Sequence, residues 1–529
     1  MVYSRLILTW LQLFVIATGL VDAYDLVANL DYGTFEGAYN AKYNISYWQK
    51  IPFAAPPVAP QPPLPITNGT YDSSQPFDMC PQRTVNGSED CLYLGLYSRP
   101  WTLGSALRPV VVTFYGGGFV QGSASFTTLP PSAYPILNVS VSSDMIFVYP
   151  NYRTNAFGFL PGAEVAADAT SDANAGLLDQ EMALQWTQSH IAQFGGDPDR
   201  VTIWGQSAGG GSVLAQTIAR RGREKPLFRQ AMASSPFWPK TYLVDAPEAQ
   251  WRYDRLANLT GCAGEGSLRC LKELDVQTIR DASLVIVDSH KYNTSTFEWG
   301  PVIDGVFLQE PLSEAVMTRD VGIQYGFGMY NTHEGESFVP SGLKSATDTG
   351  SPPFNSSAAS FDEWLAGYLP GFNDEELARL KELYPEVGSS ELITSYNDSF
   401  TRAGLIYRDS VLACPAYWMA GATPDGGWLG EYTISPAQHA SDVYWWNSVN
   451  SAQETDTLHY EGYAGAMASF FMTSDPNAEK LTTDEISGVP TLSTSEEFVV
   501  NSVGFTTAKL NQFQERCGFW KEMAPKVPI

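Results

Sequence analysis

The sequence predicts a fold of the α/β class, because two β-prone runs each lead into a glycine-rich turn and one of these turns opens a helical segment. Residues 201–204 are Val-Thr-Ile-Trp, residues 205–209 are Gly-Gln-Ser-Ala-Gly, and residues 212–219 have the composition of a helix. Residues 111–114 are a second β-prone run, and three glycines follow it at 116–118. Both turns therefore stand at the ends of predicted strands.

Ser207 is the candidate nucleophile at the first of these turns. Strand, Gly-x-Ser-x-Gly and helix in this order are the context of a serine raised on a sharp turn at a sheet edge. Gly205 and Gly209 flank it, at positions where side chains would collide with neighbouring elements. The N-terminus of the following helix would stabilise negative charge beside the serine. Ordinary glycine-rich turns share these five letters, so the strand and the helix carry the interpretation.

The glycines at 116–118 favour a cradle for an oxyanion. Backbone N–H groups without side chains can approach a developing negative charge closely. We expect Gly117 and Gly118, together with Ala208 after the serine, to donate these hydrogen bonds. Tyr115 precedes the glycines, where histidine is common. A phosphate-binding loop is the competing interpretation, but the two glycine patterns typical of nucleotide-binding loops do not occur in the sequence.

A serine hydroxyl needs a base, and in chains with this turn the histidine comes last in order. His190 precedes Ser207 and lies in a predicted helix, so its position excludes it. The remaining histidines are His290, His333, His439 and His459. His439 is favoured because it lies in a polar loop after a β-prone run at 432–434. On the pattern alone, His459 stays an alternative.

Glu334 is the candidate acid that would orient the imidazole and stabilise its protonated form. It is followed by Gly335 and lies in a loop beyond a strand-like segment that begins at Ile323. A solvated loop carboxylate is the alternative reading of the same residue. The sequence has no His-Glu-x-x-His and no Cys-x-x-Cys pattern, so we expect no metal and no cofactor.

Residues 1–23 predict a signal peptide. Arg5 precedes an apolar run at 6–17, and small residues lead up to Ala23. The run is shorter than the roughly 20 apolar residues that a membrane-spanning helix needs. No later segment is long and apolar enough, and the C-terminus has no hydrophobic tail for a lipid anchor. We therefore expect a secreted protein without a stable membrane anchor.

Cysteines and glycosylation sequons agree with export through an oxidising pathway. The candidate glycosylation sites are Asn44, Asn68, Asn86, Asn138, Asn258, Asn293, Asn355 and Asn397. Six cysteines permit 15 connectivities. Short loops close at low entropic cost, which favours pairing in sequence order. The expected disulfides are Cys80 with Cys91, Cys262 with Cys270, and Cys414 with Cys517.

The formal net charge of −26 excludes nucleic acid and an anionic membrane as partners, because phosphate binding requires a basic face. Acidic residues are scattered along the chain, as on a solvated surface. No flexible linker, charge block or repeat divides residues 24–529, so we expect a single domain with insertions. The expected partner is a small molecule, and the sequence does not predict the oligomeric state.

Several further motifs carry a family resemblance. They are Pro-Phe-Ala-Ala-Pro-Pro-Val at 52–58, Ser-Glu-Asp-Cys-Leu-Tyr-Leu at 88–94, Asn-Tyr-Arg at 151–153, Gly-Leu-Leu-Asp-Gln at 176–180, Phe-Gly-Gly-Asp-Pro at 194–198 and Ser-Asp-Pro-Asn at 474–477. With the two glycine turns, they make the chain from about Asn40 to its end resemble the type-B carboxylesterase and cholinesterase family of α/β hydrolases. The resemblance implies an α/β-hydrolase fold, with a large, mostly parallel central sheet flanked by helices and with cap-like insertions.

The resemblance also implies roles for individual residues. Ser207 would be the nucleophile, His439 the general base and Glu334 the acid, with Gly117, Gly118 and Ala208 as oxyanion donors and with the sequential disulfides. Arg153 and Asp179 match a structural ion pair of the family. Ser235 falls where the family has a serine near the triad, but its neighbours differ, so we leave it out of the site.

The function implied is that of a secreted carboxylic ester hydrolase that works through an acyl-enzyme. Two departures from the family narrow the substrate. The loop between Cys80 and Cys91 is short and contains no Trp, and Gln206 replaces an acidic residue common before the nucleophile. Both disfavour a choline ester, whose cation is recognised by an aromatic face. A short loop also disfavours lipase action, so the expected substrate is a small or medium soluble ester.

Two other functions remain open on the sequence. An acyltransferase or lactone-forming enzyme would use the same triad with an alcohol in place of water. A binding module that kept the fold and lost catalysis is the second alternative, against which the intact triad counts. The aromatic residues Phe119, Phe237, Trp238 and Trp299 are candidates for either the pocket or the core.

Overall fold

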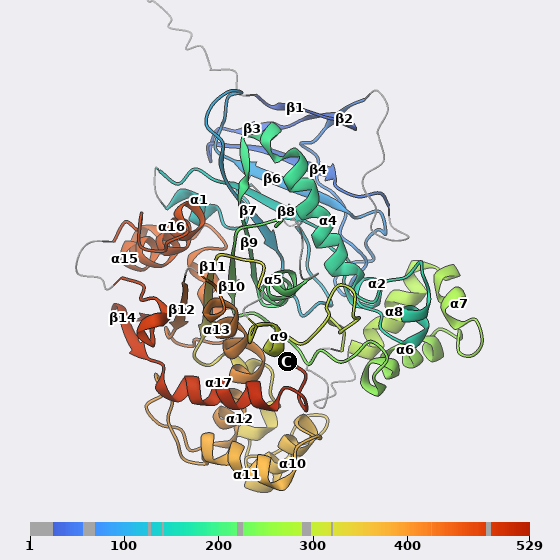
Figure 1. The fold of residues 1–529 in the computed structure, drawn as a ribbon, viewed down its shortest axis with the longest axis vertical. Helices are drawn as coiled ribbons and strands as arrows, with labels where there is room; N and C mark the ends of the chain where they lie inside the picture. Colours follow the sequence, from blue (N-terminus) through green and yellow to red (C-terminus); the bar gives the residue numbers. More distant parts are fainter. Residues whose placement is uncertain are drawn as a thin grey trace, which may run out of the picture.

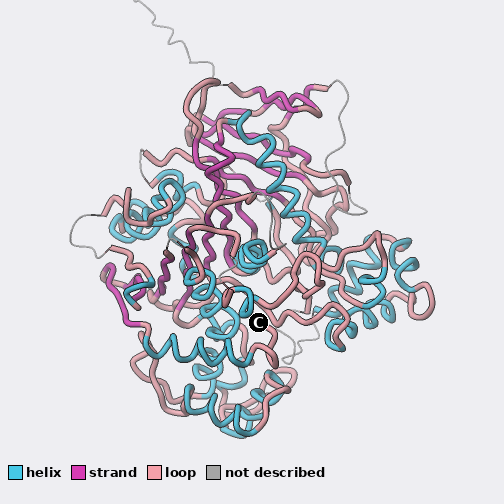
Figure 2. Tube along the Cα trace, viewed as in Figure 1, coloured by secondary structure: helices cyan, strands magenta, loops and turns pink. Residues whose placement is uncertain are grey.

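The computed structural model describes residues 25–56, 69–124, 129–139, 142–219, 226–287, 298–318, 321–424, 426–482 and 488–529. The predicted signal peptide, residues 1–23, lies outside the described residues, as do Asn68, His290 and Asn293. The three-stranded sheet β1-β2-β5 lies beside an 11-stranded sheet of order β14-β13-β12-β11-β10-β9-β7-β8-β6-β4-β3 (Figures 1 and 2).

The strands have the following bounds: β1 Val27–Leu30, β2 Gly33–Glu36, β3 Ala38–Asn40, β4 Ile45–Pro52, β5 Thr70–Asp72, β6 Tyr93–Ser98, β7 Arg108–Phe114, β8 Ile146–Pro150, β9 Gly196–Gln206, β10 Gln230–Ser234, β11 Tyr325–Asn331, β12 Gly427–Tyr432, β13 Glu496–Asn501 and β14 Gly504–Lys509. Every neighbouring pair from β8 through β7, β9, β10, β11 and β12 to β13 is parallel. Antiparallel strands complete both edges. The large, mostly parallel sheet predicted from the sequence is confirmed.

The helices are α1 Tyr134–Asn138, α2 Asn155–Gly158, α3 Ala163–Ala167, α4 Ala175–His190, α5 Ala208–Ile218, α6 Pro247–Leu259, α7 Ser267–Glu273, α8 Val276–Val287, α9 Leu312–Ala315, α10 Ala358–Tyr368, α11 Asp374–Leu383, α12 Ser399–Arg408, α13 Cys414–Gly421, α14 Ala452–Thr455, α15 Thr457–His459, α16 Gly465–Thr473 and α17 Asn511–Met523. In Figure 1, α6, α7 and α8 gather at one side of the molecule, and α10, α11, α12 and α17 gather at its lower end. Helices α6–α8 are inserted between β10 and β11, helices α10–α12 are inserted between β11 and β12, and α17 follows the last strand.

The central strands bury both faces, which is why their sequences are almost continuously apolar. Alternate residues of a strand point to opposite faces. On β7, Val110 and Val112 join the hydrophobic core that contains α4 and α5, whereas Val111 joins the core that contains α16. The same alternation separates Ile203 from Trp204 on β9.

The three disulfides join the cysteines that the sequence order predicts. Cys80 pairs with Cys91 across a separation of 11 residues, and Cys262 pairs with Cys270 across 8 residues. The third links Cys414, at the start of α13, to Cys517 in α17. In the chain-entropy view, this last bridge constrains the unfolded chain most, because its loop of 103 residues is the longest.

Two buried glutamates share a proton between neighbouring strands. The hydroxyl of Tyr330 on β11 lies 3.0 Å from Glu431 Oε2 on β12 and 2.8 Å from Glu497 Oε2 on β13. A phenol has one proton, so it donates to one carboxylate and accepts from the other, which must be protonated. Arg408 lies 3.5 Å from Glu431, which places the negative charge there. Burial raises the pKa of both carboxyl groups, that of Glu497 well above its usual range, while Arg408 opposes the rise at Glu431.

Glu497→Gln is expected to stabilise the protein at pH values above the raised pKa of Glu497. The folded state binds this proton more tightly than the unfolded chain, so the stabilisation is present below a pH of about 4.5 and is lost as the pH rises through the raised pKa. Glutamine keeps a donor for Tyr330 and cannot ionise, which should raise the free energy of unfolding by about 1–3 kcal/mol above that pKa. Thermal unfolding at pH 5 and pH 8 measures the effect.

The matched control is Glu496→Gln, one residue earlier in the same strand. Glu496 pairs with Lys509 at the partly exposed edge of the sheet, so its replacement should change the unfolding midpoint little at either pH. An unchanged difference between the two pH values in Glu497→Gln would contradict the shared proton.

Candidate active site

Ser207 stands on a strained turn between β9 and α5. Strand β9 ends at Gln206, helix α5 begins at Ala208, and Ser207 has φ of 58° and ψ of −126°. A Cβ on Gly205 would lie 2.3 Å from the carbonyl oxygen of Gly209, and a Cβ on Gly209 would lie 2.0 Å from the carbonyl oxygen of Phe114. Glycine is therefore required at both flanks of the serine, as the sequence predicted.

The backbone around Ser207 over-determines this strained conformation. Its N–H donates to the carbonyl of Ser234 at 3.1 Å. Its own carbonyl accepts from the N–H groups of Gly211 at 2.9 Å and Phe237 at 2.8 Å. Strand β10, the loop that follows it and helix α5 thus hold the turn together, which is how a conformation costing about 1–3 kcal/mol persists.

Three residues from three strand ends form a chain of hydrogen bonds. His439 Nε2 lies 2.9 Å from Ser207 Oγ, and His439 Nδ1 lies 3.0 Å from Glu334 Oε2. Ser207 follows β9, Glu334 follows β11, and His439 follows β12 in a loop. Because parallel strands bring their carboxyl ends to one edge, these residues meet there although 232 residues separate Ser207 from His439.

The environment of Glu334 suits an acid that carries negative charge. Its side chain is fully buried, at the start of the short helix Glu334–Ser337. Within the described residues, Glu334 Oε1 has no hydrogen-bond partner. The hydrogen bond of this carboxylate to a side chain is therefore the one from Oε2 to His439. The ring of Phe338 packs edge-on against the imidazole, with centroids 4.9 Å apart. Charge that forms on His439 is therefore stabilised mainly by Glu334.

The other described histidines after Ser207 are engaged elsewhere. His459, the alternative base, has Nδ1 2.8 Å from Asp456 and Nε2 2.7 Å from the carbonyl of Asn501. Its ring also stacks on Trp445, with centroids 5.3 Å apart. His333 contacts Glu336 at 2.8 Å. The hydrogen-bond pattern assigns His459 to the scaffold.

The glycine turn at 116–118 lies against Ser207. A Cβ on Gly116 would lie 2.7 Å from the carbonyl oxygen of Gln206 and 3.0 Å from Ser207 Cβ. Gly117 and Gly118 have φ of 119° and 64°. In the described part of the chain, the N–H groups of Gly117, Gly118 and Ala208 donate to no backbone carbonyl. These are the three N–H groups that the resemblance implies as oxyanion donors.

Two buried amides, which the sequence did not reveal, tie this turn to the loop closed by Cys80 and Cys91. Gln82 Nε2 donates to the carbonyl of Gly122, and Gly122 N–H donates back to Gln82 Oε1, both at 2.8 Å. Asn151 accepts from Ala124 N–H at 2.9 Å and donates to the carbonyl of Cys91 at 2.9 Å. The disulfide loop therefore supports the glycine turn.

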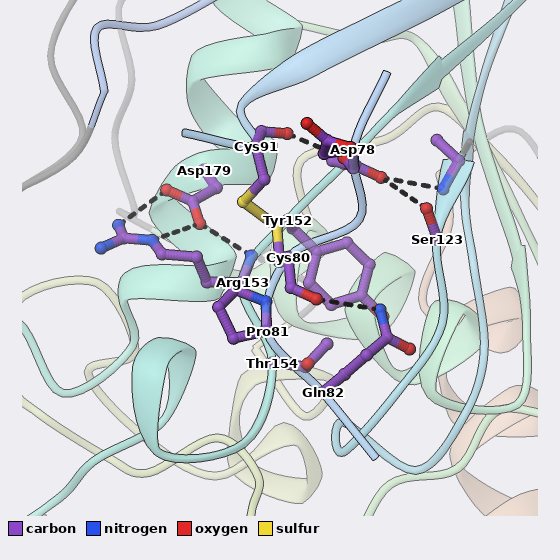
Figure 3. The surroundings of a disulfide bond; sticks show 12 residues. Asp78, Cys80, Pro81, Gln82, Cys91, Ser123, Tyr152, Arg153, Thr154 and Asp179 are labelled. Atoms are coloured by element: carbon purple, nitrogen blue, oxygen red, sulfur yellow. Dashed lines mark hydrogen bonds and ion pairs between the residues drawn. A yellow bond between two sulfur atoms is a disulfide. The ribbon is translucent and has the colours of Figure 1, made fainter. Parts of the chain in front are cut away.

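Figure 3 shows this loop, with Gln82 and Ser123 on one side of the disulfide and Arg153 on the other. Arg153 and Asp179 form the structural ion pair that the resemblance implies, at 2.8 Å, and Asp179 is fully buried. Tyr115 and Tyr152 stack with centroids 4.1 Å apart, and the hydroxyl of each donates to the backbone carbonyl of the other. Tyr115 thus fixes the start of the glycine turn.

Further polar groups lie behind the hydrogen-bonded residues Ser207, His439 and Glu334. Asn331 Nδ2 donates to Ser235 Oγ at 2.9 Å and to Asp442 Oδ1 at 3.2 Å. Asp442 also accepts from Trp446 and Tyr463, and burial raises its pKa. Sequence reasoning missed Asn331 and Asp442, because nothing in their local sequence shows that they face this site.

A cavity of about 310 Å³ opens beside Ser207 and His439. Thr113, Trp204 and Trp446 are among its lining residues. The aromatic residues that the sequence offered for pocket or core lie in the core: Phe119, Phe237, Trp238 and Trp299 are fully buried. None of the four lines this cavity.

The surface agrees with glycosylation at most of the candidate sites that the structure describes. Asn44, Asn86, Asn138, Asn258 and Asn397 are exposed, and Asn355 is half-buried. Over the described ranges, we find no helix that is both long and apolar enough to cross a membrane.

Comparison with known proteins agrees with this geometry. The chain matches the carboxylesterase family over residues 24–519. It is 30% identical to "Carboxylesterase patB" of Penicillium expansum over 406 residues, which cover 74% of this chain and 68% of the relative. It is 35% identical to "Secreted lipase 1" of Botryotinia fuckeliana and 33% identical to "Secreted triacylglycerol lipase LIP1" of Gibberella zeae, but it spans only 50% and 54% of their lengths.

The solved structure of Aspergillus niger EstA is similar in fold, with a TM-score of 0.80 at 24% identity over 95% of this chain and 99% of that one. A chain with this sheet and this serine turn is an α/β hydrolase. It belongs to the carboxylesterase family and is a carboxylic ester hydrolase.

Proposed function

We propose that the protein is a secreted serine esterase that hydrolyses a small or medium soluble ester through an acyl-enzyme on Ser207. The observation that carries the proposal is the continuous pair of hydrogen bonds from Ser207 through His439 to buried Glu334, at 2.9 and 3.0 Å. Serine, imidazole and carboxylate in this order are the groups that activate a hydroxyl as a nucleophile.

Acylation follows from the contacts. Glu334 accepts the N–H of His439 Nδ1, so Nε2 presents its lone pair to the Ser207 hydroxyl and removes the proton as Oγ attacks the ester carbonyl. The carbonyl oxygen becomes an oxyanion, which the N–H groups of Gly117, Gly118 and Ala208 bind. When the carbon–oxygen bond to the alcohol breaks, His439 returns the proton to the leaving oxygen.

Deacylation repeats these steps with water. His439 removes a proton from the water molecule, the hydroxide oxygen attacks the acyl carbon, and the same three donors bind the second oxyanion. The Ser207 oxygen then leaves and recovers its proton from His439, which releases the free carboxylic acid. The balance is one ester and one water consumed for one acid and one alcohol released.

The short loop between Cys80 and Cys91 supports a soluble substrate. It lies on the protein, closed by the disulfide and fixed through Gln82 and Asn155, whose Nδ2 donates to the carbonyl of Pro81 at 3.0 Å. A loop of this length and attachment is unsuited to act as a long mobile lid. Two relatives are named lipases, so chain-length preference is the point that separates this proposal from lipase action.

Export is proposed from three features of the chain. Residues 1–23 have the pattern of a signal peptide. Three disulfides are typical of an oxidising compartment. Most of the candidate glycosylation sites that the structure describes are exposed.

Hydrolysis of a p-nitrophenyl ester series from acetate to palmitate tests the proposal. We expect the mature protein to cleave acetate and butyrate with kcat/KM at least about tenfold above that of palmitate. Turnover that rises toward palmitate and requires an emulsion would replace the soluble ester with a lipase substrate. No turnover of any ester by the folded protein would favour an acyltransferase or a binding module.

A further inference from the structure

The cavity beside the triad extends from Ser207 over the face of the central sheet. Its floor is one row of residues on adjacent parallel strands. Thr113 of β7 pairs with Trp204 of β9, and the register that sets Val112 opposite Val148 places Thr113 beside Tyr149 of β8. Paired residues point to the same face of a sheet. A small residue between two large aromatic ones leaves the space that the cavity occupies.

The wall facing this floor comes from the segment just after the catalytic histidine. Val443 and Trp446 line the cavity there, and the rings of Trp446 and Trp204 meet edge to face with centroids 4.9 Å apart. Both indole N–H groups are directed at protein partners, Asp442 for Trp446 and Ser234 for Trp204. The two rings therefore offer apolar surface to the cavity.

Among the residues that the structure describes, the lining of the cavity has no acidic side chain and no basic one other than His439. Gln206 stands beside the nucleophile. Removing a cation from water costs several kcal/mol, of which a desolvated aromatic face returns about 2 kcal/mol or somewhat more. The nearby carboxylate of Asp442 already accepts from Asn331, Trp446 and Tyr463. An uncharged group is therefore the better occupant.

The size of the cavity limits the group that it can hold. The cavity of about 310 Å³ is twice the roughly 150 Å³ that accommodates benzene in an engineered apolar cavity. It has room for a fused ring system.

The position of the cavity decides which half of an ester enters it. His439 Nε2 must reach the leaving oxygen to return the proton, so the alcohol half lies on the His439 side of Ser207. We propose that this cavity is an alcohol subsite for esters of uncharged aryl-methyl alcohols, an inference that rests on the proposed esterase function. Thr113 is its specificity-determining residue, because a larger side chain there would fill the floor.

Acetate esters with one acyl group and different alcohols test the subsite. We expect kcat/KM to rise at least about tenfold from ethyl acetate to naphthylmethyl acetate, since a buried ring contributes roughly 1.5–3 kcal/mol. We also expect the uncharged tert-butyl isostere of acetylcholine to exceed acetylcholine by at least about tenfold. Equal values within either pair, with Ser207-dependent turnover, would overturn the subsite and leave the esterase function intact.

Two variants at Thr113 separate the effect of side-chain size in the cavity from a general loss of activity. Thr113→Phe should lower the ratio of naphthylmethyl to ethyl acetate kcat/KM at least about tenfold, while Thr113→Val, of the same shape, should keep it within about threefold. The ratio cancels any common loss at the triad, and thermal midpoints establish folding. An unchanged ratio in folded Thr113→Phe would contradict the subsite. No turnover of any ester by the wild type would overturn the proposed function itself.

Discussion

Replacing Ser207 by alanine is expected to lower kcat for a soluble ester on the order of a million-fold, because removal of a triad nucleophile leaves only oxyanion binding and substrate positioning. Alanine loses the side-chain hydrogen bond to His439. It keeps the backbone hydrogen bonds to Ser234, Gly211 and Phe237 that fix the turn. The thermal midpoint should therefore change little. Initial rates on p-nitrophenyl acetate and a thermal melt measure both quantities.

Ser235→Ala is the matched control for this substitution. Ser235 also has positive φ and ends a neighbouring strand, but its hydroxyl accepts from Asn331. We expect it to lose less than about tenfold in kcat, with a stability cost of about 1–3 kcal/mol for the unpaired amide. Comparable activity in Ser207→Ala and the wild type would remove Ser207 as the nucleophile.

Replacing His439 by alanine is expected to reduce kcat by a similar factor, on the order of a million-fold, because Ser207 then has no base at 2.9 Å. His459→Ala should keep most of the activity. His459 connects Asp456 to the carbonyl of Asn501 and stacks on Trp445, so its loss should appear as a lower thermal midpoint. The pair of variants, assayed on one ester, compares two histidines with different partners.

The reverse result, with His459→Ala inactive and His439→Ala active, would identify His459 as the general base in place of His439. It would also break the link to Glu334, which contacts His439 and is separated from it by 105 residues in sequence.

The nucleophile turn was the most predictable part of the site. Its strand, glycines and helix are consecutive in sequence, and the clashes that exclude a Cβ at Gly205 and Gly209 come from elements that this turn itself brings together. The same holds for the glycine turn after β7. For both turns, the order of residues in the local sequence was enough to predict the local backbone geometry.

The base could not be chosen from local sequence. His439 and His459 each lie near an acidic residue, and their roles differ only in what the fold brings to them. The burial of Glu334 likewise depends on packing against α12, where a Cβ on Gly335 would lie 1.9 Å from the carbonyl of Gly404. The choice of His439 and Glu334 came from chain order and family resemblance, because hydrophobic periodicity does not identify a base or an acid.

The cavity could not be predicted from the sequence for a related reason. Thr113 faces Trp204 only through the pairing of β7 with β9, and a shift of one residue would turn Thr113 to the opposite core. The four aromatic residues that the sequence offered for the pocket or the core lie in the core, and Trp204 and Trp446, which line the cavity, were not among them.

The most direct test of the central claim is to trap the acyl-enzyme. The mature protein is mixed with p-nitrophenyl acetate, quenched in acid within the first turnover, digested and analysed by mass spectrometry. The account predicts one acetyl group on the peptide that carries Ser207, and none in His439→Ala or Ser207→Ala. An acetyl group on another side chain, or turnover without any covalent species, would contradict it.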